Sequence, residues 1–239
     1  RVLFRSLRPH AADTIQLLHD ALSNGKRVIY EGAQGALLDL DHGTFPYVTS
    51  STTMSGGVFA GAGVAPRHVQ GVVGILKAYM TRVGGGPMPS ELLDETGERL
   101  RKLGDEFGAT TGRPRRCGWL DVVPLRRVIN IGGVEHIVMT KIDVLTGFDP
   151  IRICTAYELD GKRVEQFPSR TAQLERAKPL YEELPGWTED IGACRAWGDL
   201  PAATRKYINR VEELLGASVS VVSLGPDRDQ TLVRTDPFG

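Results

Sequence analysis

The chain has 239 residues, of which 41% are hydrophobic and 24% charged, a composition typical of a folded protein and not of a disordered one. Its 29 basic and 29 acidic residues cancel, so the molecule as a whole does not attract nucleic acid or an acidic membrane, and any anion site must be local. No apolar run approaches the roughly 18 residues that a membrane span needs. We therefore expect small-molecule partners, with no nucleic acid and no membrane among them.

The cysteines and the first residues bear on where the protein works. Cys117, Cys154 and Cys194 are odd in number and show no CxxC spacing, which favours a reducing compartment and argues against structural zinc. We predict a cytoplasmic location. The chain starts RVLFRSLRPH, without an initiator Met or a signal-peptide pattern, so we expect a fragment of a longer protein.

The first part of the chain predicts short elements of both kinds. Apolar residues recur at helical spacing over residues 11–24, and a short strand is expected at 27–30. The glycine-rich segment 56–65 lacks the Gly-Lys-Ser/Thr ending of a phosphate loop, so close helix packing explains it better. Residues 69–83 are rich in β-formers and predict a central strand that opens into the glycine turn at 84–87.

The second part continues in the same mixed manner. Helices are expected over residues 91–104, 122–130, 172–184 and 201–215, strands over 136–140 and 218–224, and a β-hairpin over 151–167. The predicted fold class is therefore α/β, with a mainly parallel central sheet flanked by helices and a small antiparallel hairpin region.

Residues 31–51, EGAQGALLDLDHGTFPYVTSS, are unusual because small residues surround Gln34 and hydroxyl side chains end the segment. Gln34 can both donate and accept, as an amide-like purine edge requires, and the hydroxyls can bind phosphate. The alternative is an Asx-rich turn in which Asp41 and His42 bond to the backbone. Asp39, Asp41 and His42 also suggest a metal, but the arrangement is too generic to assign one.

Residues 107–121, FGATTGRPRRCGWLD, are too rich in glycine and proline to form a helix, and we call this segment the arginine loop. Arg113, Arg115 and Arg116 carry planar forks that bind carboxylate or phosphate in bidentate fashion. Two threonines and a glycine beside them offer neutral donors. The loop is thus suited to a substrate with several negative charges, and the alternative is a solvated basic turn.

Two strand ends carry the chemistry of guanine recognition. After the strand at 136–140, the Asp143 carboxylate can accept from the ring N1–H and the exocyclic amine together, while the Lys141 stem packs along the base. Adenine offers no such pair of donors. After the strand at 218–224, a turn beginning at Ser223 can present backbone N–H groups to the guanine carbonyl. If the two strands are parallel neighbours, both segments lie at one edge of the sheet.

Taken together, these segments resemble the adenylosuccinate synthetase family over residues 28–238. The resemblance rests on EGAQGALLDLDHGTFPYVTSS, ILKAYMTRVG, GDEFGATTGRPRRCGWLD, TKID, LPGW, YINRVEEL and SLGPDR. It implies a fold similar to P-loop NTPases and a GTP-dependent ligation of L-aspartate to inosine monophosphate (IMP). The products would be adenylosuccinate, GDP and phosphate, formed through a 6-phosphoryl-IMP intermediate. The resemblance also implies Mg²⁺ as cofactor and a homodimer as the working assembly.

The resemblance also implies roles for particular residues, which fall into three groups by ligand. IMP would be bound by Gln34, Thr49, Val83 and Arg113; aspartate by Ala109, Thr110, Thr111, Gly112, Arg113, Pro114 and Arg115; and GTP by Arg115, Lys141, Ile142, Asp143, Ser223, Leu224 and Gly225.

The family's GDEGKGK phosphate loop, its aspartate base and its histidine acid do not occur in these 239 residues. We therefore expect the catalytic base, the acid and the Mg²⁺ ligands in an N-terminal half, with Gln34 in a supporting role and no metal site in this chain. The fold would be incomplete, and the chain inactive, without that half. All 239 residues would be the C-terminal portion of one domain, with residues 1–150 carrying the IMP and aspartate part and 151–239 the hairpin and the final guanine-binding strand.

Two other functions stay open. A guanine-nucleotide-binding module without catalysis fits the missing phosphate loop, and weak nucleotide binding by the chain would argue against it. A nucleic-acid binder that uses the loop arginines is disfavoured by the neutral net charge and by the lack of interleaved aromatic residues.

Overall fold

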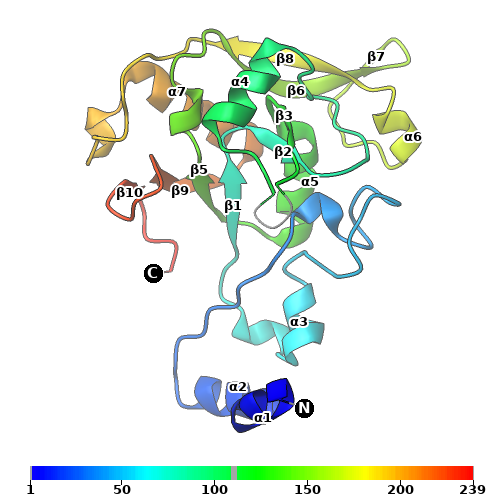
Figure 1. Ribbon diagram of the computed structural model, residues 1–239, viewed down its shortest axis with the longest axis vertical. Coiled ribbons are helices and arrows are strands. Elements are labelled where there is room, and N and C mark those ends of the chain that lie inside the picture. The colour runs from blue at the N-terminus through cyan, green and yellow to red at the C-terminus, as the bar shows by residue number, and fades with distance from the viewer. Residues whose placement is uncertain (1, 109–111, 239) are drawn as a thin grey trace.

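A computed structural model describes residues 2–108 and 112–238. Its main sheet has the strand order β1-β5-β9-β10, formed by β1 (Val73–Lys77), β5 (His136–Thr140), β9 (Ser218–Ser223) and β10 (Thr231–Val233). The first three strands are parallel, and β10 runs antiparallel to β9. Figure 1 shows this sheet in the middle of the molecule. The α/β class and the mainly parallel central sheet are confirmed.

A second sheet is built around the long strand β6 (Ile151–Leu159). It pairs in parallel with β4 (Leu120–Asp121) and antiparallel with both β7 (Lys162–Val164) and β8 (Lys178–Leu184). The β6–β7 connection is the predicted hairpin, and its turn places Asp160 at a φ of 51°. In Figure 1 this hairpin sheet lies at the top of the molecule, beyond the main sheet.

The helices α4 (Glu95–Leu103), α5 (Val122–Gly132) and α7 (Ala202–Leu215) lie beside these sheets. Helix α5 packs against β6 and α7, and α7 also contacts β9. Side chains fix where two of them begin: Asp94 accepts from the first backbone N–H groups of α4, and Asp121 does so for α5. The predicted helices at 122–130 and 201–215 are confirmed.

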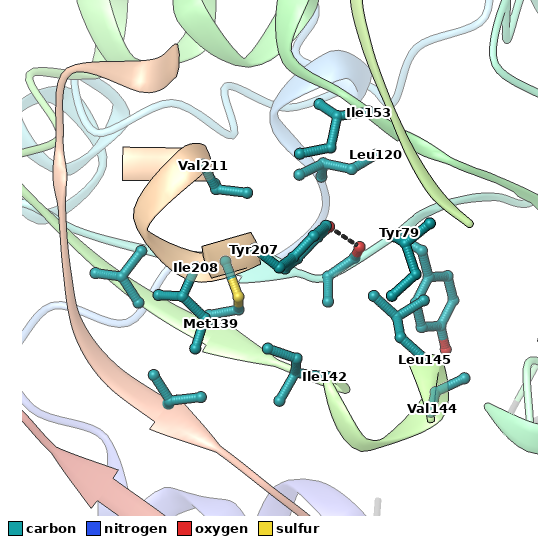
Figure 2. Close-up of a cluster of buried hydrophobic side chains, with 14 of the residues drawn as sticks. Tyr79, Leu120, Met139, Ile142, Val144, Leu145, Ile153, Tyr207, Ile208 and Val211 are labelled. Carbon is teal, nitrogen blue, oxygen red and sulfur yellow. Dashed lines mark hydrogen bonds between the residues drawn. The ribbon is translucent and has the colours of Figure 1, made fainter. Parts of the chain in front are cut away.

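The core lies between the main sheet and α7. Figure 2 shows Met139 and Ile142 packed around Tyr207, and all three side chains are fully buried. The Tyr207 hydroxyl donates to the Ala78 carbonyl oxygen at 2.6 Å, so the polar end of this buried ring is satisfied. The strands that end at the proposed guanine site are thus anchored in a packed core.

The N-terminal segment contributes α1 (Val2–Leu7), α2 (Thr14–Ser23) and α3 (Gly57–Ala62), which lie below the sheets in Figure 1. The predicted helix at 11–24 is confirmed as α2, and it buries none of its residues. Short 3₁₀ turns complete the described chain at Arg8–His10, Ala36–Leu38, Pro66–His68, Asp143–Leu145 and Trp197–Asp199. Of the helices that the structure describes, none has both the length and the apolar character to cross a membrane.

Three secondary-structure predictions are wrong. Residues 27–30 form no strand, because no other described strand pairs with them. The expected strand at 69–83 is divided, because buried Ala78 and Tyr79 interrupt it and the chain then enters β2 (Met80–Arg82), which pairs antiparallel with β3 (Arg116–Gly118). The small strands β3, β4 and β10 were not predicted.

The expected helix at 172–184 is the third wrong prediction. Helix α6 (Thr171–Leu174) is only one turn, and the rest of the segment is strand β8. Pro179 removes a backbone N–H that a helix would need, and the long antiparallel pairing with β6 outweighs the helical spacing of the apolar residues.

Candidate active site

The two strand ends predicted to read guanine lie side by side. Strands β5 and β9 are parallel neighbours, with His136 opposite Ser218 and Met139 opposite Val222 after one bulge. Parallel strands end at the same edge of a sheet, which is where open α/β sheets bind ligands. The geometry that the guanine prediction required is therefore present.

At the end of β5, Lys141 adopts a left-handed backbone, with a φ of 61°. Its Nζ donates to the Gly104 carbonyl oxygen at 2.9 Å, so the stem is held across the turn that follows α4. Ile142 is buried in the core. Burial raises the pKa of the Asp143 carboxyl above its ordinary value, and a ligand donor that meets this carboxylate would offset that cost.

At the end of β9, Ser223 Oγ donates to the Gly225 carbonyl oxygen at 3.0 Å. Leu224 is buried, and its backbone N–H donates to the Gln230 carbonyl oxygen at 2.7 Å. A side chain at Gly225 would collide with the Gln230 amide. A larger residue here would have to displace the Gln230 side chain, and with glycine the backbone of the turn can approach a flat base closely.

A pocket of about 280 Å³ lies between the 38–49 segment and the turn after β2. Thr49 and Val83, both predicted to bind IMP, line it. Gln34 and Arg113, the other two residues predicted to bind IMP, are not among its lining residues and are exposed, and Gln34 has a φ of 71°. The structure thus brings together two of the four residues and leaves Gln34 and Arg113 outside the pocket wall.

Arg82 also lines this pocket and holds its walls together, a role that the sequence did not reveal. Its guanidinium donates to Thr44 Oγ1 at 2.9 Å, to the Tyr47 carbonyl at 3.0 Å and to the Gly85 carbonyl at 2.8 Å. Thr44 and Tyr47 belong to one wall and Gly85 to the other. The shape of the pocket therefore depends on one cation that bridges two segments.

Asp39 organises the turn in front of this pocket. Its fully buried carboxylate accepts backbone N–H groups from Asp41, His42, Thr53 and Met54 at 2.7–3.1 Å. Burial opposes the charge, but these four donors hold the pKa of Asp39 below its ordinary value. The structure therefore contains an Asx-type turn built on the Asp39 side chain, to which Asp41 and His42 contribute backbone N–H groups.

The Mg²⁺ that the family resemblance implies needs a group of oxygen ligands. Within residues 2–108 and 112–238, no group of three or more His, Cys, Asp or Glu side chains is placed to hold a metal ion. Asp39 has both oxygens engaged by backbone N–H groups. The residues described here do not fit a magnesium site, and we derive no catalytic step through the metal.

In the arginine loop, Ala109, Thr110 and Thr111 lie outside the described residues, so their predicted aspartate contacts stay predictions. The described parts of the loop meet at its base: Gly108 N–H donates to the Arg113 carbonyl at 2.8 Å, and Phe107 forms a β-bridge with Pro114. Gly112 has a φ of 62°. Arg113 and Gly112 are exposed.

Arg115 and Arg116 differ in their surroundings. Arg116 forms an ion pair with Glu91 and donates to the Gly86 carbonyl at 2.7 Å, so its fork is occupied within the fold. Arg115 Nη1 donates to Glu106 at 2.6 Å, and its side chain remains 30% exposed. Arg116 is thus engaged within the fold, and anion binding by Arg113 and Arg115 stays a prediction.

The family model described as adenylosuccinate synthetase matches residues 1–232. The chain belongs to the adenylosuccinate synthetase family. The adenylosuccinate synthetase of Trichlorobacter lovleyi is 52% identical over 98% of this chain and 54% of its own length. That of Moorella thermoacetica is 54% identical over 98% of this chain and 55% of its own.

A solved structure of fully ligated adenylosuccinate synthetase from Plasmodium falciparum is similar to the fold, with a TM-score of 0.93 and 41% identity. It covers 96% of this chain, which in turn covers 55% of that protein. The chain therefore spans about half the length of the adenylosuccinate synthetases that it matches.

Proposed function

We propose that the protein containing this chain joins L-aspartate to IMP at the expense of GTP, giving adenylosuccinate, GDP and phosphate through 6-phosphoryl-IMP. The observation that carries the proposal is the parallel pairing of β5 and β9, which puts Lys141, Asp143 and Ser223 at one sheet edge. Membership of the adenylosuccinate synthetase family supports it. The residues at this edge carry the functional information, because one fold hosts many activities.

At this edge, Asp143 would accept two hydrogen bonds from guanine, and the aliphatic stem of Lys141 would pack along the base. Ser223 and the backbone of the turn at Leu224 and Gly225 would complete the contact, while Ile142, which is buried, would contribute backbone atoms only. The raised pKa of Asp143 supports this role, because burial outweighs the hydrogen bonds and the Lys141 charge that favour its carboxylate, so further donors from a ligand would stabilise it.

The pocket lined by Thr49 and Val83 would hold IMP, with the Thr49 hydroxyl available to phosphate oxygens. Gln34 would reach IMP from outside the pocket wall. Arg113 would contact both IMP and aspartate, and Arg115 both aspartate and GTP. Arginine forks suit these roles because they stabilise spread negative charge without moving a proton.

We place the acid, the base and the magnesium ligands outside these 239 residues. When bound, Mg²⁺ would neutralise charge on the GTP phosphates, while the residues of this chain orient base, nucleotide and aspartate. A cytoplasmic homodimer is part of the proposal, and the three unpaired cysteines support a reducing compartment. The division of one domain into 1–150 and 151–239 also stays a prediction.

The test is product formation by the full-length protein. We expect adenylosuccinate to appear only when IMP, aspartate, GTP and Mg²⁺ are all supplied, and ATP to replace GTP poorly. A protein that binds GTP with no turnover under any combination would support the non-catalytic module instead. A protein that binds no guanine nucleotide would overturn both functions.

A further inference from the structure

Glu106 lies at the junction of the two proposed ligand sites and carries no role in the function proposed above. Its carboxylate is fully buried, and both of its oxygens accept hydrogen bonds. Lys77 Nζ contacts Oε1 and Oε2 at 2.8 and 2.9 Å, Tyr79 Oη donates to Oε1 at 2.6 Å, and Arg115 Nη1 donates to Oε2 at 2.6 Å. A carboxylate with this many donors is held in one orientation.

The charges around Glu106 do not cancel. One carboxylate faces two cations, Lys77 and Arg115, and Lys141 lies close enough to disfavour the charge on Lys77. Burial opposes ionisation, but the donors from Lys77, Tyr79 and Arg115 hold the pKa of Glu106 below its ordinary value. The cluster therefore keeps a surplus of positive charge, which suits an anionic ligand beside it.

The backbone around Glu106 connects this cluster to both proposed sites. Its carbonyl accepts the Arg115 N–H at 2.9 Å, and its own N–H donates to the Arg101 carbonyl at the end of α4 at 2.9 Å. Two residues earlier, the Gly104 carbonyl accepts from Lys141 Nζ. A side chain at Gly104 would collide with the Tyr79 hydroxyl, so this turn is tightly packed.

We propose that Glu106 is a positioning residue, which aims Arg115 at the nucleotide and joins the arginine loop to the Lys141 end of the guanine site. This inference rests on the proposed function. Glu106 touches neither ligand and acts through Arg115. Two of the cations that it faces, Lys77 and Arg115, come from segments far apart in sequence, so the carboxylate fixes their mutual placement. Charged groups fixed before the ligand arrives need no reorganisation during the reaction.

The test is a double-mutant cycle in the full-length protein with Glu106→Gln and Arg115→Ala. We expect Glu106→Gln alone to lower kcat by about 100-fold, the scale of a misplaced catalytic contact. In the Arg115→Ala background, Glu106→Gln should change kcat by less than about 3-fold, because a residue that acts through Arg115 has nothing left to position. Equal effects in both backgrounds would overturn the inference.

Glu91→Gln is the matched control, because it removes the carboxylate from the neighbouring arginine, Arg116. It should leave kcat within about 3-fold of the wild type. If Glu106→Gln does not fold, the same cycle is run with Lys77→Met added, which removes the surplus cation. A Glu91→Gln loss as large as that of Glu106→Gln would also overturn the inference.

A second readout does not depend on turnover. Glu106→Gln should speed hydrogen exchange at the Gly108 and Arg115 amides, which close the base of the loop, by about 10-fold, while Glu91→Gln should not. Unchanged exchange at both amides would overturn the positioning role even in an active protein. An inactive wild type that still shows this exchange difference would instead count against the proposed function.

Discussion

Lys141 reaches from the end of β5 to the carbonyl oxygen of Gly104, and the 2.9 Å hydrogen bond links two sites that the sequence presents separately. Lys141 belongs to the guanine motif, and Gly104 begins the turn that leads into the arginine loop. The Gly104 turn packs against Tyr79, whose hydroxyl donates to Glu106. Nucleotide and aspartate would therefore meet residues that share one packed support.

We predict that Arg113 contributes to the use of aspartate as a substrate. Replacing it with Leu in the full-length protein should weaken productive aspartate use by about 3 kcal/mol, because the substrate carboxylate would lose a desolvated partner. This corresponds to roughly a 100-fold loss in kcat/KM for aspartate. Steady-state kinetics against aspartate measure it.

Arg163→Leu is the control for that variant, since Arg163 is an exposed arginine on the hairpin and is paired with Glu165. Its kcat/KM for aspartate should equal that of the wild type. Wild-type kinetics for Arg113→Leu would mean that the loop is only a solvated basic turn.

Asp121 should make the protein less stable as pH rises. Its carboxylate is 2% exposed and accepts from Tyr157 Oη at 2.6 Å, yet burial raises its pKa from 3.8 to about 6. Between these values the folded state binds more protons than the unfolded state, so stability falls as pH rises from about 4 to about 6. Above that range the ionised Asp121 lowers the free energy of unfolding by about 3 kcal/mol relative to low pH.

The change Asp121→Asn removes this titration but keeps a helix-capping side chain for α5. We expect the variant to gain stability relative to wild type as pH rises: the difference in free energy of unfolding, variant minus wild type, should be about 2 kcal/mol larger at pH 7 than at pH 4. Urea unfolding of the full-length protein at both values measures the difference. A pH-independent difference would contradict the buried-carboxylate account.

The 239-residue chain alone should not make adenylosuccinate. Phosphoryl transfer needs magnesium and a phosphate cradle, and a positioned acid or base adds typically 10²–10⁴-fold. We place these groups in the part of the protein outside this chain. An ordinary rate of turnover by the chain alone would show that placement to be wrong, and Asp39, Asp41 and His42 would then be the next residues to substitute.

Strand β1 gives the isolated chain a second measurable property. Within the described residues it is the outer strand of the main sheet, and Ile75 on it is 72% exposed. Such an edge promotes pairing with another chain. We expect Ile75→Lys to reduce self-association of the isolated chain in light scattering, whereas Lys162→Ala on the exposed hairpin should not.

The sequence predicts best where a segment's own pattern decides its structure. Helix α7 and strands β5 and β9 were predicted because their apolar periodicity agrees with their burial. Strand β8 was missed because its pairing with β6 decides its conformation. The same holds in the site. One tetrapeptide was enough to predict the roles of Lys141 and Asp143, but the role inferred for Glu106 depends on its contact with Lys77, which is 29 residues away in the sequence.

The central claim is guanine recognition by Asp143 at the edge shared by β5 and β9. Its most direct test is the nucleotide preference of full-length wild type and Asp143→Asn, with Asp160→Asn on the hairpin turn as control. We predict that Asp143→Asn lowers kcat/KM for GTP by about 10- to 100-fold, the worth of hydrogen bonds to a charged group. It should raise use of xanthosine triphosphate, because the amide can donate where xanthine accepts. Unchanged GTP kinetics, with no gain for xanthosine triphosphate, would contradict the account.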